Sequence, residues 1–208
     1  MIKLRPTVLL MALLALLFVN ARSSRADTIY NNLGPGNTWI VNREYDVNSD
    51  FMATLFVTSS GGNLATVITP LFSLNNPVTV DLYTNSAGQP GTLVEAWSVS
   101  APGFPGQLTT LTSVLNPLLS ANTRYWLVIP VTDIQKLNLA WYQNNQGLDG
   151  GIWIGNNLDA LIQAEPASPM PAIQLNSTSS SPVPEPCTML LFCSGLVGLA
   201  AYRRFKKA

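Results

Sequence analysis

The central part of the chain, from residue 27 to residue 175, alternates apolar and polar side chains with a period of two. Such alternation is typical of a β-strand that buries one face. Periodicity of the helical kind is nearly absent from this region. The segment 78–83 illustrates the pattern, with Val78, Val80 and Leu82 on one face and Thr79, Asp81 and Tyr83 on the other.

Short apolar segments of this kind recur along the region, and clusters of Gly, Pro and Asn separate them. About ten short strands at this spacing predict an all-β fold, an antiparallel β-sandwich or jelly roll. We expect the strands at residues 30–41, 51–58, 63–74, 78–83, 92–99, 107–115, 123–131, 137–143, 151–155 and 172–175.

Two of these segments permit more detailed predictions. We expect 78–99 to form a β-hairpin with a long loop, because Gln89, Pro90 and Gly91 suit a type II turn. The segment 124–129 is apolar on both faces apart from its first residue, which predicts a central strand. One face of that strand would pack on the opposite sheet, and a loop would cover Trp126 on the other.

The beginning of the chain has the pattern of an export signal. Lys3 and Arg5 precede an apolar run at 7–19, which is short for a membrane-spanning helix. Small side chains then occupy the −3 and −1 positions of a cleavage site after Ala26. The sequence therefore predicts a signal peptide at residues 1–26, which signal peptidase removes; cleavage after Ala21 is the alternative.

A second apolar run, at residues 187–202, contains no charged residue. As a helix it would span about 24 Å, somewhat less than the ~30 Å hydrocarbon core of a bilayer. A buried core helix is the alternative, but such a helix rarely runs without charge into a cationic segment. We therefore expect a transmembrane helix and basic tail at 187–208, stopped on the cytoplasmic side of the inner membrane. The stopping residues would be Arg203, Arg204, Lys206 and Lys207.

Residues 176–186 are rich in Ser, Thr and Pro, and we expect them to form a flexible stalk that follows the domain at 27–175. The stalk ends in Pro184, Glu185 and Pro186, directly before the apolar run. This order of motif, apolar helix and basic tail resembles the PEP-CTERM sorting signal of exported bacterial proteins. Cys187, directly after the motif, leaves that match intact.

The resemblance implies how the protein is sorted and processed. The tail holds such proteins in the inner membrane until an exosortase, a membrane-embedded enzyme, cleaves near the motif and frees the body for the cell surface or the medium. Carriers usually come from bacteria that make extracellular polysaccharide. The segments 31–36, 81–91 and 118–128 are also similar to β-rich domains that precede such tails, a family without an established molecular activity.

Charge and residue types exclude several functions for the body. Between residues 27 and 183, three basic residues stand against ten acidic ones, a net charge of −7, which repels nucleic acid. The chain has no histidine, and both of its cysteines lie at or beyond residue 187. An imidazole base, a thiol nucleophile and an internal disulfide are therefore excluded from the body. We expect no enzymatic activity and assign no catalytic residue; a glycan hydrolase with paired carboxylates is an alternative.

One short cluster of oxygen donors could bind calcium. Asp46, Asn48 and Asp50 alternate in the way that a calcium loop begins. The sixth and twelfth positions are Phe51 and Val57, so the cluster is not an EF-hand. A solvated turn before the next strand is the other interpretation, because Asp and Asn are common in turns. Apart from this structural calcium, we expect no cofactor.

The body contains five tryptophans, and exposed aromatic rings can stack on sugars. Trp141 and Tyr142 are the first candidates, since side-chain amides follow them, and Trp153 beside a Gly-Gly turn is the second. The alternative is that these rings fill the core of a domain without disulfides. The sequence thus predicts an exported surface or matrix protein that interacts with extracellular polysaccharide, with a self-associating structural module as a further alternative.

Overall fold

A computed structural model describes residues 27–41, 43–46, 49–75, 77–133, 135–136 and 138–178. The compact unit within the chain spans Ala26–Thr178. The predicted signal peptide, sorting motif and terminal helix lie outside the described residues. Within the described part, no helix has the length and apolar character needed to cross a membrane.

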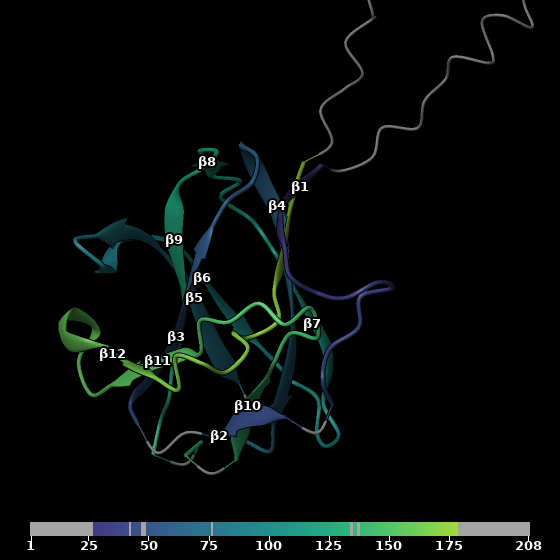
Figure 1. Ribbon diagram of the computed structural model, residues 1–208, viewed down its shortest axis with the longest axis vertical. Coiled ribbons are helices and arrows are strands. Elements are labelled where there is room, and N and C mark those ends of the chain that lie inside the picture. The colour runs from purple at the N-terminus through teal and green to yellow at the C-terminus, as the bar shows by residue number, and fades with distance from the viewer. Residues whose placement is uncertain are drawn as a thin grey trace, which may run out of the picture. The chain divides into compact units, whose positions relative to one another are not determined.

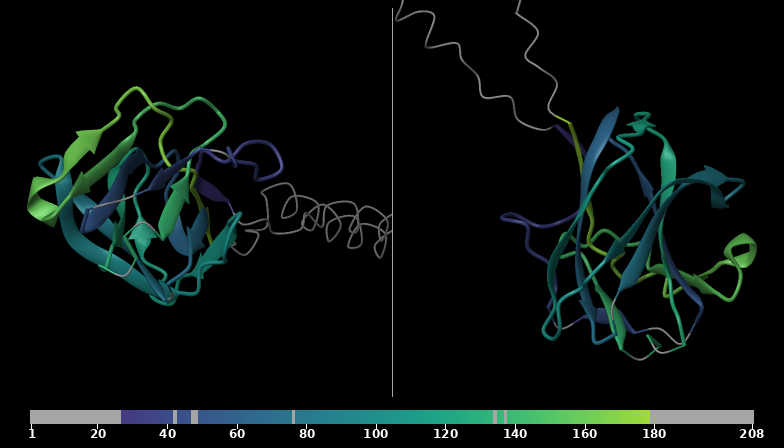
Figure 2. Two further views of the ribbon diagram at one scale, coloured as in Figure 1. Left: turned by 90° about the horizontal axis from the view of Figure 1, so that it is seen from below. Right: turned by 180° about the vertical axis from the view of Figure 1, so that it is seen from behind.

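Two antiparallel sheets make up the described unit, which confirms the predicted all-β class (Figures 1 and 2). Among the described residues, the first sheet has seven strands and the second has six. The first follows the order β1 (Thr28–Asn31), β13 (Gln174–Ser177), β4 (Gly62–Ser73), β10 (Leu139–Tyr142) and β2 (Glu44–Asp46), with β7 (Gln107–Thr112) and β8 (Leu118–Leu119) also paired to β4. The second follows the order β12 (Ile162–Ala164), β11 (Ile152–Gly155), β3 (Phe51–Val57), β9 (Arg124–Pro130), β5 (Val78–Ser86) and β6 (Gln89–Val99).

Alternating side chains of both sheets meet in one continuous hydrophobic core. Val67 and Trp141 contribute from the first sheet, and Val80 and Leu127 from the second; all four are fully buried. The polar atom of Trp141 is satisfied there, because its Nε1 donates a hydrogen bond of 2.7 Å to the hydroxyl of Thr69. The alternation of apolar and polar residues in the sequence thus determines which face of each sheet is turned to the core.

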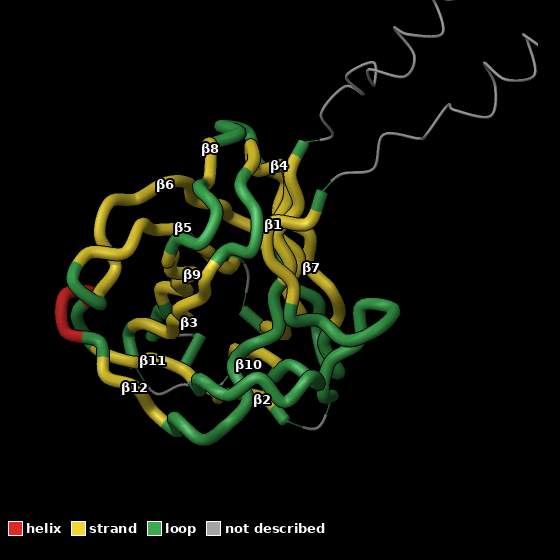
Figure 3. The backbone as a smooth tube through the Cα atoms, turned by 45° about the horizontal axis from the view of Figure 1, so that its top comes forward, coloured by secondary structure: helices red, strands yellow, loops and turns green. Residues whose placement is uncertain are grey.

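Strand β9 is central, as predicted, because it pairs with β3 on one side and β5 on the other. Trp126 points to the outer face and is nevertheless fully buried. The loop that covers it carries the short 3₁₀ helix η1 (Leu158–Ala160), which is red in Figure 3 beside β6 and β12. Gln89 fixes this loop through two hydrogen bonds to the backbone of Leu161, of 3.2 and 3.1 Å.

The hairpin at β5 and β6 forms as predicted, but its turn differs. Ser86 pairs with Gln89, so the turn contains only Ala87 and Gly88, whose φ angles are +51° and +85°. Positive φ at both central residues is typical of the tight hairpin turn that matches strand twist. The predicted long loop and type II turn are therefore wrong. Pro90 is tolerated inside β6 because β6 is an edge strand.

The remaining differences concern short elements and strand ends. The first predicted strand, at 30–41, ends already at Asn31, and β13 continues to Ser177, two residues into the segment predicted as stalk. Strands β2, β8 and β12 span only two or three residues each. Such short elements carry too little alternation to be recognised in a sequence.

Candidate functional site

The structure separates the three aromatic residues that the sequence suggested for glycan binding. Trp141 and Tyr142 lie on β10, with exposed fractions of 0% and 1%. The Tyr142 hydroxyl donates a hydrogen bond of 2.5 Å to the carbonyl of Pro105. A ring without an exposed face cannot stack on a sugar, which corrects the interpretation of these two residues. Trp153 lies on β11 of the other sheet and is only partly buried.

The proposed calcium donors are described only in part. Asn48 and the side chain of Asp46 lie outside the described residues. The carboxylate of Asp50 already faces a cation, because Lys136 Nζ lies 2.7 Å from it and 2.9 Å from Asp133. Among the residues that the structure describes, no group of three or more acidic, His or Cys side chains is placed to hold a metal.

The outer face of the second sheet carries the candidate site around Trp153. Directly opposed residues of antiparallel strands share a face. One row across four strands consists of Trp153, Ala53, Val128 and Asp81, and the neighbouring row of Leu55, Trp126 and Tyr83. At about 4.8 Å per strand, Trp153 and Asp81 stand roughly 14 Å apart. We call the set Leu55, Asp81, Tyr83, Trp126 and Trp153 the outer aromatic face.

Packing orients the rings on this face. The Trp153 ring meets the buried Trp126 ring edge-on, with centroids 5.2 Å apart and an interplanar angle of 85°. Trp126 is held in turn by a hydrogen bond of 3.0 Å from its Nε1 to Asn85. Leu55, Tyr83 and Trp153 remain partly exposed around this buried centre. The face therefore offers aromatic surface that is fixed in place from below.

Asp81 is the charged group of the outer aromatic face, and it is only 7% exposed. The Tyr83 hydroxyl donates a long hydrogen bond of 3.4 Å to Oδ2, while Oδ1 is buried and has no partner among the described residues. Burial raises the pKa of Asp81, since it removes water from the charged carboxylate. Burial and the Asp81 charge together raise the pKa of Tyr83.

The Asp81→Asn variant is expected to be more stable than the natural protein at pH 7. The folded state binds the Asp81 proton more tightly than the unfolded state, whose carboxyl has a pKa near 3.8. Stability is therefore lost as the pH rises from that value through the raised pKa of the folded state. The stability advantage of the variant should disappear on acidification towards pH 3.8, which melting temperatures at several pH values would reveal. A constant difference at every pH would contradict this account.

Comparison with known protein families adds information about the end of the chain. A family model for the PEP-CTERM protein-sorting motif matches residues 182–204. The chain carries a PEP-CTERM sorting motif. The matched residues include Pro184, Glu185 and Pro186, together with the apolar run and the first two cations after it. The motif implies export, processing by an exosortase, and a transient C-terminal membrane anchor before the cell surface.

The β-rich unit that precedes the motif has no assigned family. The PEP-CTERM match does not extend to it, and searches of curated proteins and of solved structures found no match to the chain. Any assignment of a function to the outer aromatic face must therefore start from its own chemistry.

Two residues of this face, Asp81 and Tyr83, were not singled out as site residues from the sequence. The signal was nevertheless present, because the alternation in 78–83 places both side chains opposite Val80 and Leu82. What the sequence did not reveal is that Trp153 and Trp126 lie on the same face, on the second and the fourth strand counted from the edge strand β12. That arrangement depends on strand order.

Proposed function

We propose that the folded unit Ala26–Thr178 binds extracellular polysaccharide, without cleaving it, after the PEP-CTERM motif has directed the chain to the cell surface. The observation that carries the proposal is the combination of partly exposed Trp153 and Tyr83 rings with the buried carboxylate of Asp81 on one face. The sandwich would serve as a rigid support for this face.

The chemistry of the outer aromatic face suits a sugar polymer. Aromatic rings with an apolar body and a polar edge are common in such contacts, and their orientation here is fixed by packing on Trp126. Asp81 lies beneath this surface, and its Oδ2 accepts the hydrogen bond of the Tyr83 hydroxyl, so its role in the proposal is to orient the Tyr83 ring. Ala53 and Val128, between Trp153 and Asp81, are buried together with Leu161 of the η1 loop, so a sugar would contact the exposed parts of Trp153 and Tyr83 at the margin of this loop.

Residue types support a binding role over a catalytic one. The chain has no histidine, and its two cysteines, Cys187 and Cys193, lie outside the folded unit. A glycosidase built on two carboxylates is the alternative that needs neither residue. Release of reducing sugar from the polysaccharide would support that alternative and contradict the proposal.

Self-association through the β6 edge is disfavoured by Glu95. This residue lies on the edge strand β6 and pairs with the buried Leu82, so its carboxylate faces inward, and it is 3% exposed. Inward-pointing charges on edge strands are one of the devices that prevent edge-to-edge pairing. The structural-module alternative therefore loses support at this edge.

The Trp153→Ala variant is expected to bind the native exopolysaccharide about tenfold more weakly, equivalent to ~1.4 kcal/mol. The loss would follow from removal of the stacking surface, and affinity electrophoresis in gels that contain the polysaccharide would measure it. Phe104→Ala is the matched control. Phe104 is an aromatic residue of the β-rich unit and is 79% exposed, but it does not belong to the outer aromatic face. Equal retention of the folded Trp153→Ala and Phe104→Ala variants would contradict the proposal.

A further inference from the structure

A second feature of the surface is a turn that exposes three aliphatic side chains. Val114, Leu115 and Leu118 are 81%, 68% and 74% exposed. The residues from 113 to 123 include no charged side chain, although the body as a whole is acidic. We call residues 114–118 the apolar tip. Clustered exposed apolar side chains of this kind mark interaction sites with proteins or membranes.

The apolar tip is held in place from below by a buried carboxylate. Glu95 accepts hydrogen bonds from the backbone N–H of Val114 at 2.7 Å and of Leu115 at 3.2 Å, and from the Ser113 hydroxyl at 2.6 Å. The backbone N–H of Leu64 then donates to the carbonyl of Pro117 at 2.9 Å. These hydrogen bonds fix the backbone of the turn in the conformation that leaves the aliphatic side chains exposed.

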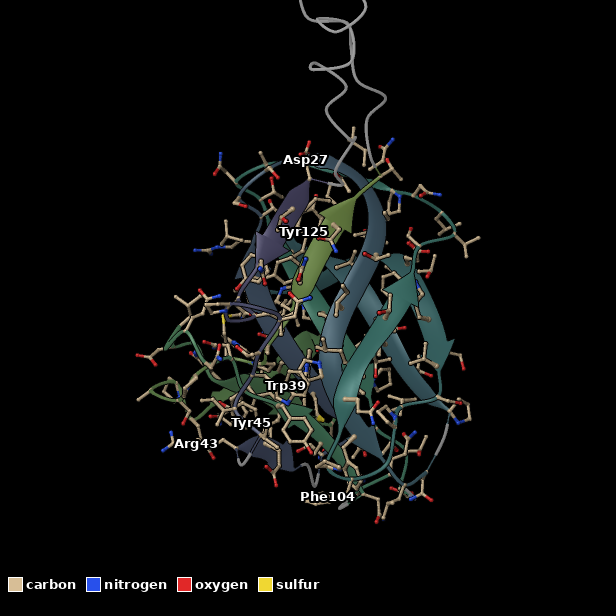
Figure 4. The ribbon with its side chains drawn as sticks, turned by 90° about the vertical axis from the view of Figure 1, so that its right-hand side faces the viewer. Asp27, Trp39, Arg43, Tyr45, Phe104 and Tyr125 are labelled. Atoms are coloured by element: carbon tan, nitrogen blue, oxygen red, sulfur yellow. The ribbon has the colours of Figure 1, made fainter. Side chains whose placement is uncertain are left out.

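The tip lies beside the point at which the described chain ends. Leu118 of β8 pairs with Asn63 of β4, and the carbonyl of Asn63 accepts a hydrogen bond of 2.8 Å from the N–H of Thr178. Since β8 and β13 flank the beginning of β4, roughly 10 Å separates them. Figure 1 shows β8, β1 and the beginning of β4 together, and Figure 4 shows Asp27 and Phe104 at opposite ends of the unit.

The length of the following chain limits how far this end can be from a bilayer. Eight residues, 179–186, separate Thr178 from the apolar run that begins at Cys187. At ~3.4 Å per residue they span at most about 30 Å. Because the PEP-CTERM motif implies a membrane anchor in this run, the tip is tethered close to the membrane surface, which raises its effective concentration there.

We propose that the apolar tip inserts into the lipid headgroup region of the membrane that holds the anchor, for as long as the chain remains anchored. Val114, Leu115 and Leu118 would enter the boundary between headgroups and acyl chains, which accepts aliphatic side chains attached to an uncharged turn. Arg124 is exposed and pairs with Val57, whose neighbour Thr58 bonds to Ser120 close to the tip. Its positive charge would attract anionic lipid headgroups. The acidic residues described near this end include Asp27 and the buried Glu95, whose carboxylate is bonded beneath the tip. The proposal rests on the anchor and not on polysaccharide binding.

Quenching by labelled lipid tests this contact in the full chain. Cys187 and Cys193 are replaced by Ser, a single cysteine is introduced as Leu115→Cys, and a fluorophore is attached to it. The chain is reconstituted into phosphatidylethanolamine–phosphatidylglycerol vesicles that contain lipid with a nitroxide near the headgroup. Phe104→Cys is the matched control, because Phe104 is 79% exposed and lies at the opposite end. We expect at least threefold stronger quenching at position 115 than at position 104.

Three results would overturn the proposal, and each has a different meaning. Equal quenching at the two positions would show that the tip does not reach the lipid. A label at position 115 that is shielded from aqueous iodide but not quenched by the lipid would indicate a second protein copy as the occupant. A chain that does not float with the vesicles would contradict the anchor itself.

Discussion

Replacing Trp141 with alanine is expected to lower the free energy of unfolding by about 3–5 kcal/mol. The ring is fully buried between the two sheets, and its removal would leave a cavity that neighbouring strands cannot fill. The hydrogen bond from its Nε1 to Thr69 is lost as well. Since domains of this size are stable by only about 5–15 kcal/mol, denaturant-induced unfolding should show a large shift of the midpoint.

Two control variants separate the packing of Trp141 from its hydrogen bond. Trp141→Phe keeps most of the ring volume and is expected to cost less, about 1–3 kcal/mol. Thr69 retains a partner in that variant, because its hydroxyl also donates to the carbonyl of Ala172 at 2.8 Å. Phe104→Ala, on the surface, is expected to change stability by less than about 0.5 kcal/mol. A cost below 1 kcal/mol for Trp141→Ala would contradict the assignment of this ring to the core.

Substituting Pro184, Glu185 and Pro186 together by alanine is expected to reduce release of the protein into the medium by roughly tenfold, the effect of losing ~1.4 kcal/mol of transition-state stabilisation in the cleavage step. These residues belong to the matched sorting motif, which implies processing by an exosortase. Without processing, the chain should accumulate in the membrane fraction with its C-terminal segment attached. Immunoblots of separated fractions would measure the distribution.

The control for this variant lies immediately before the motif. Ser179, Ser180 and Ser181 precede residue 182, at which the match begins. Their substitution by alanine should leave release unchanged. If the motif variant were released as efficiently as the natural chain, the tail would not be the determinant of processing.

Alternation with a period of two was sufficient to predict much of the fold. It placed β3, β4, β5 and β9 within a few residues of their observed ends, because each of these strands has a buried inner face. The strand around Trp126 was recognisable as central, since it is apolar on both faces. The loop over Trp126 was likewise expected, because an aromatic ring on an outer face needs a cover.

The candidate site was less accessible to sequence reasoning, because burial there depends on segments distant in the chain. Tyr142 is buried, and its hydroxyl is bonded to Pro105, 37 residues earlier in the sequence. Trp153 stays partly exposed on a strand of similar composition. Local sequence around the two aromatics does not distinguish these outcomes. The turn at Ala87 and Gly88 was missed for a different reason, since alanine rarely adopts positive φ.

The intact mass of the natural protein, measured separately in membrane and medium fractions, tests the central claim most directly. Export followed by release from a C-terminal anchor predicts a membrane form that begins at Asp27 and retains the cationic tail. It also predicts a form in the medium that begins at the same residue and ends near Pro184–Pro186. A cytosolic chain that retains both residues 1–26 and residues 184–208 would contradict the account.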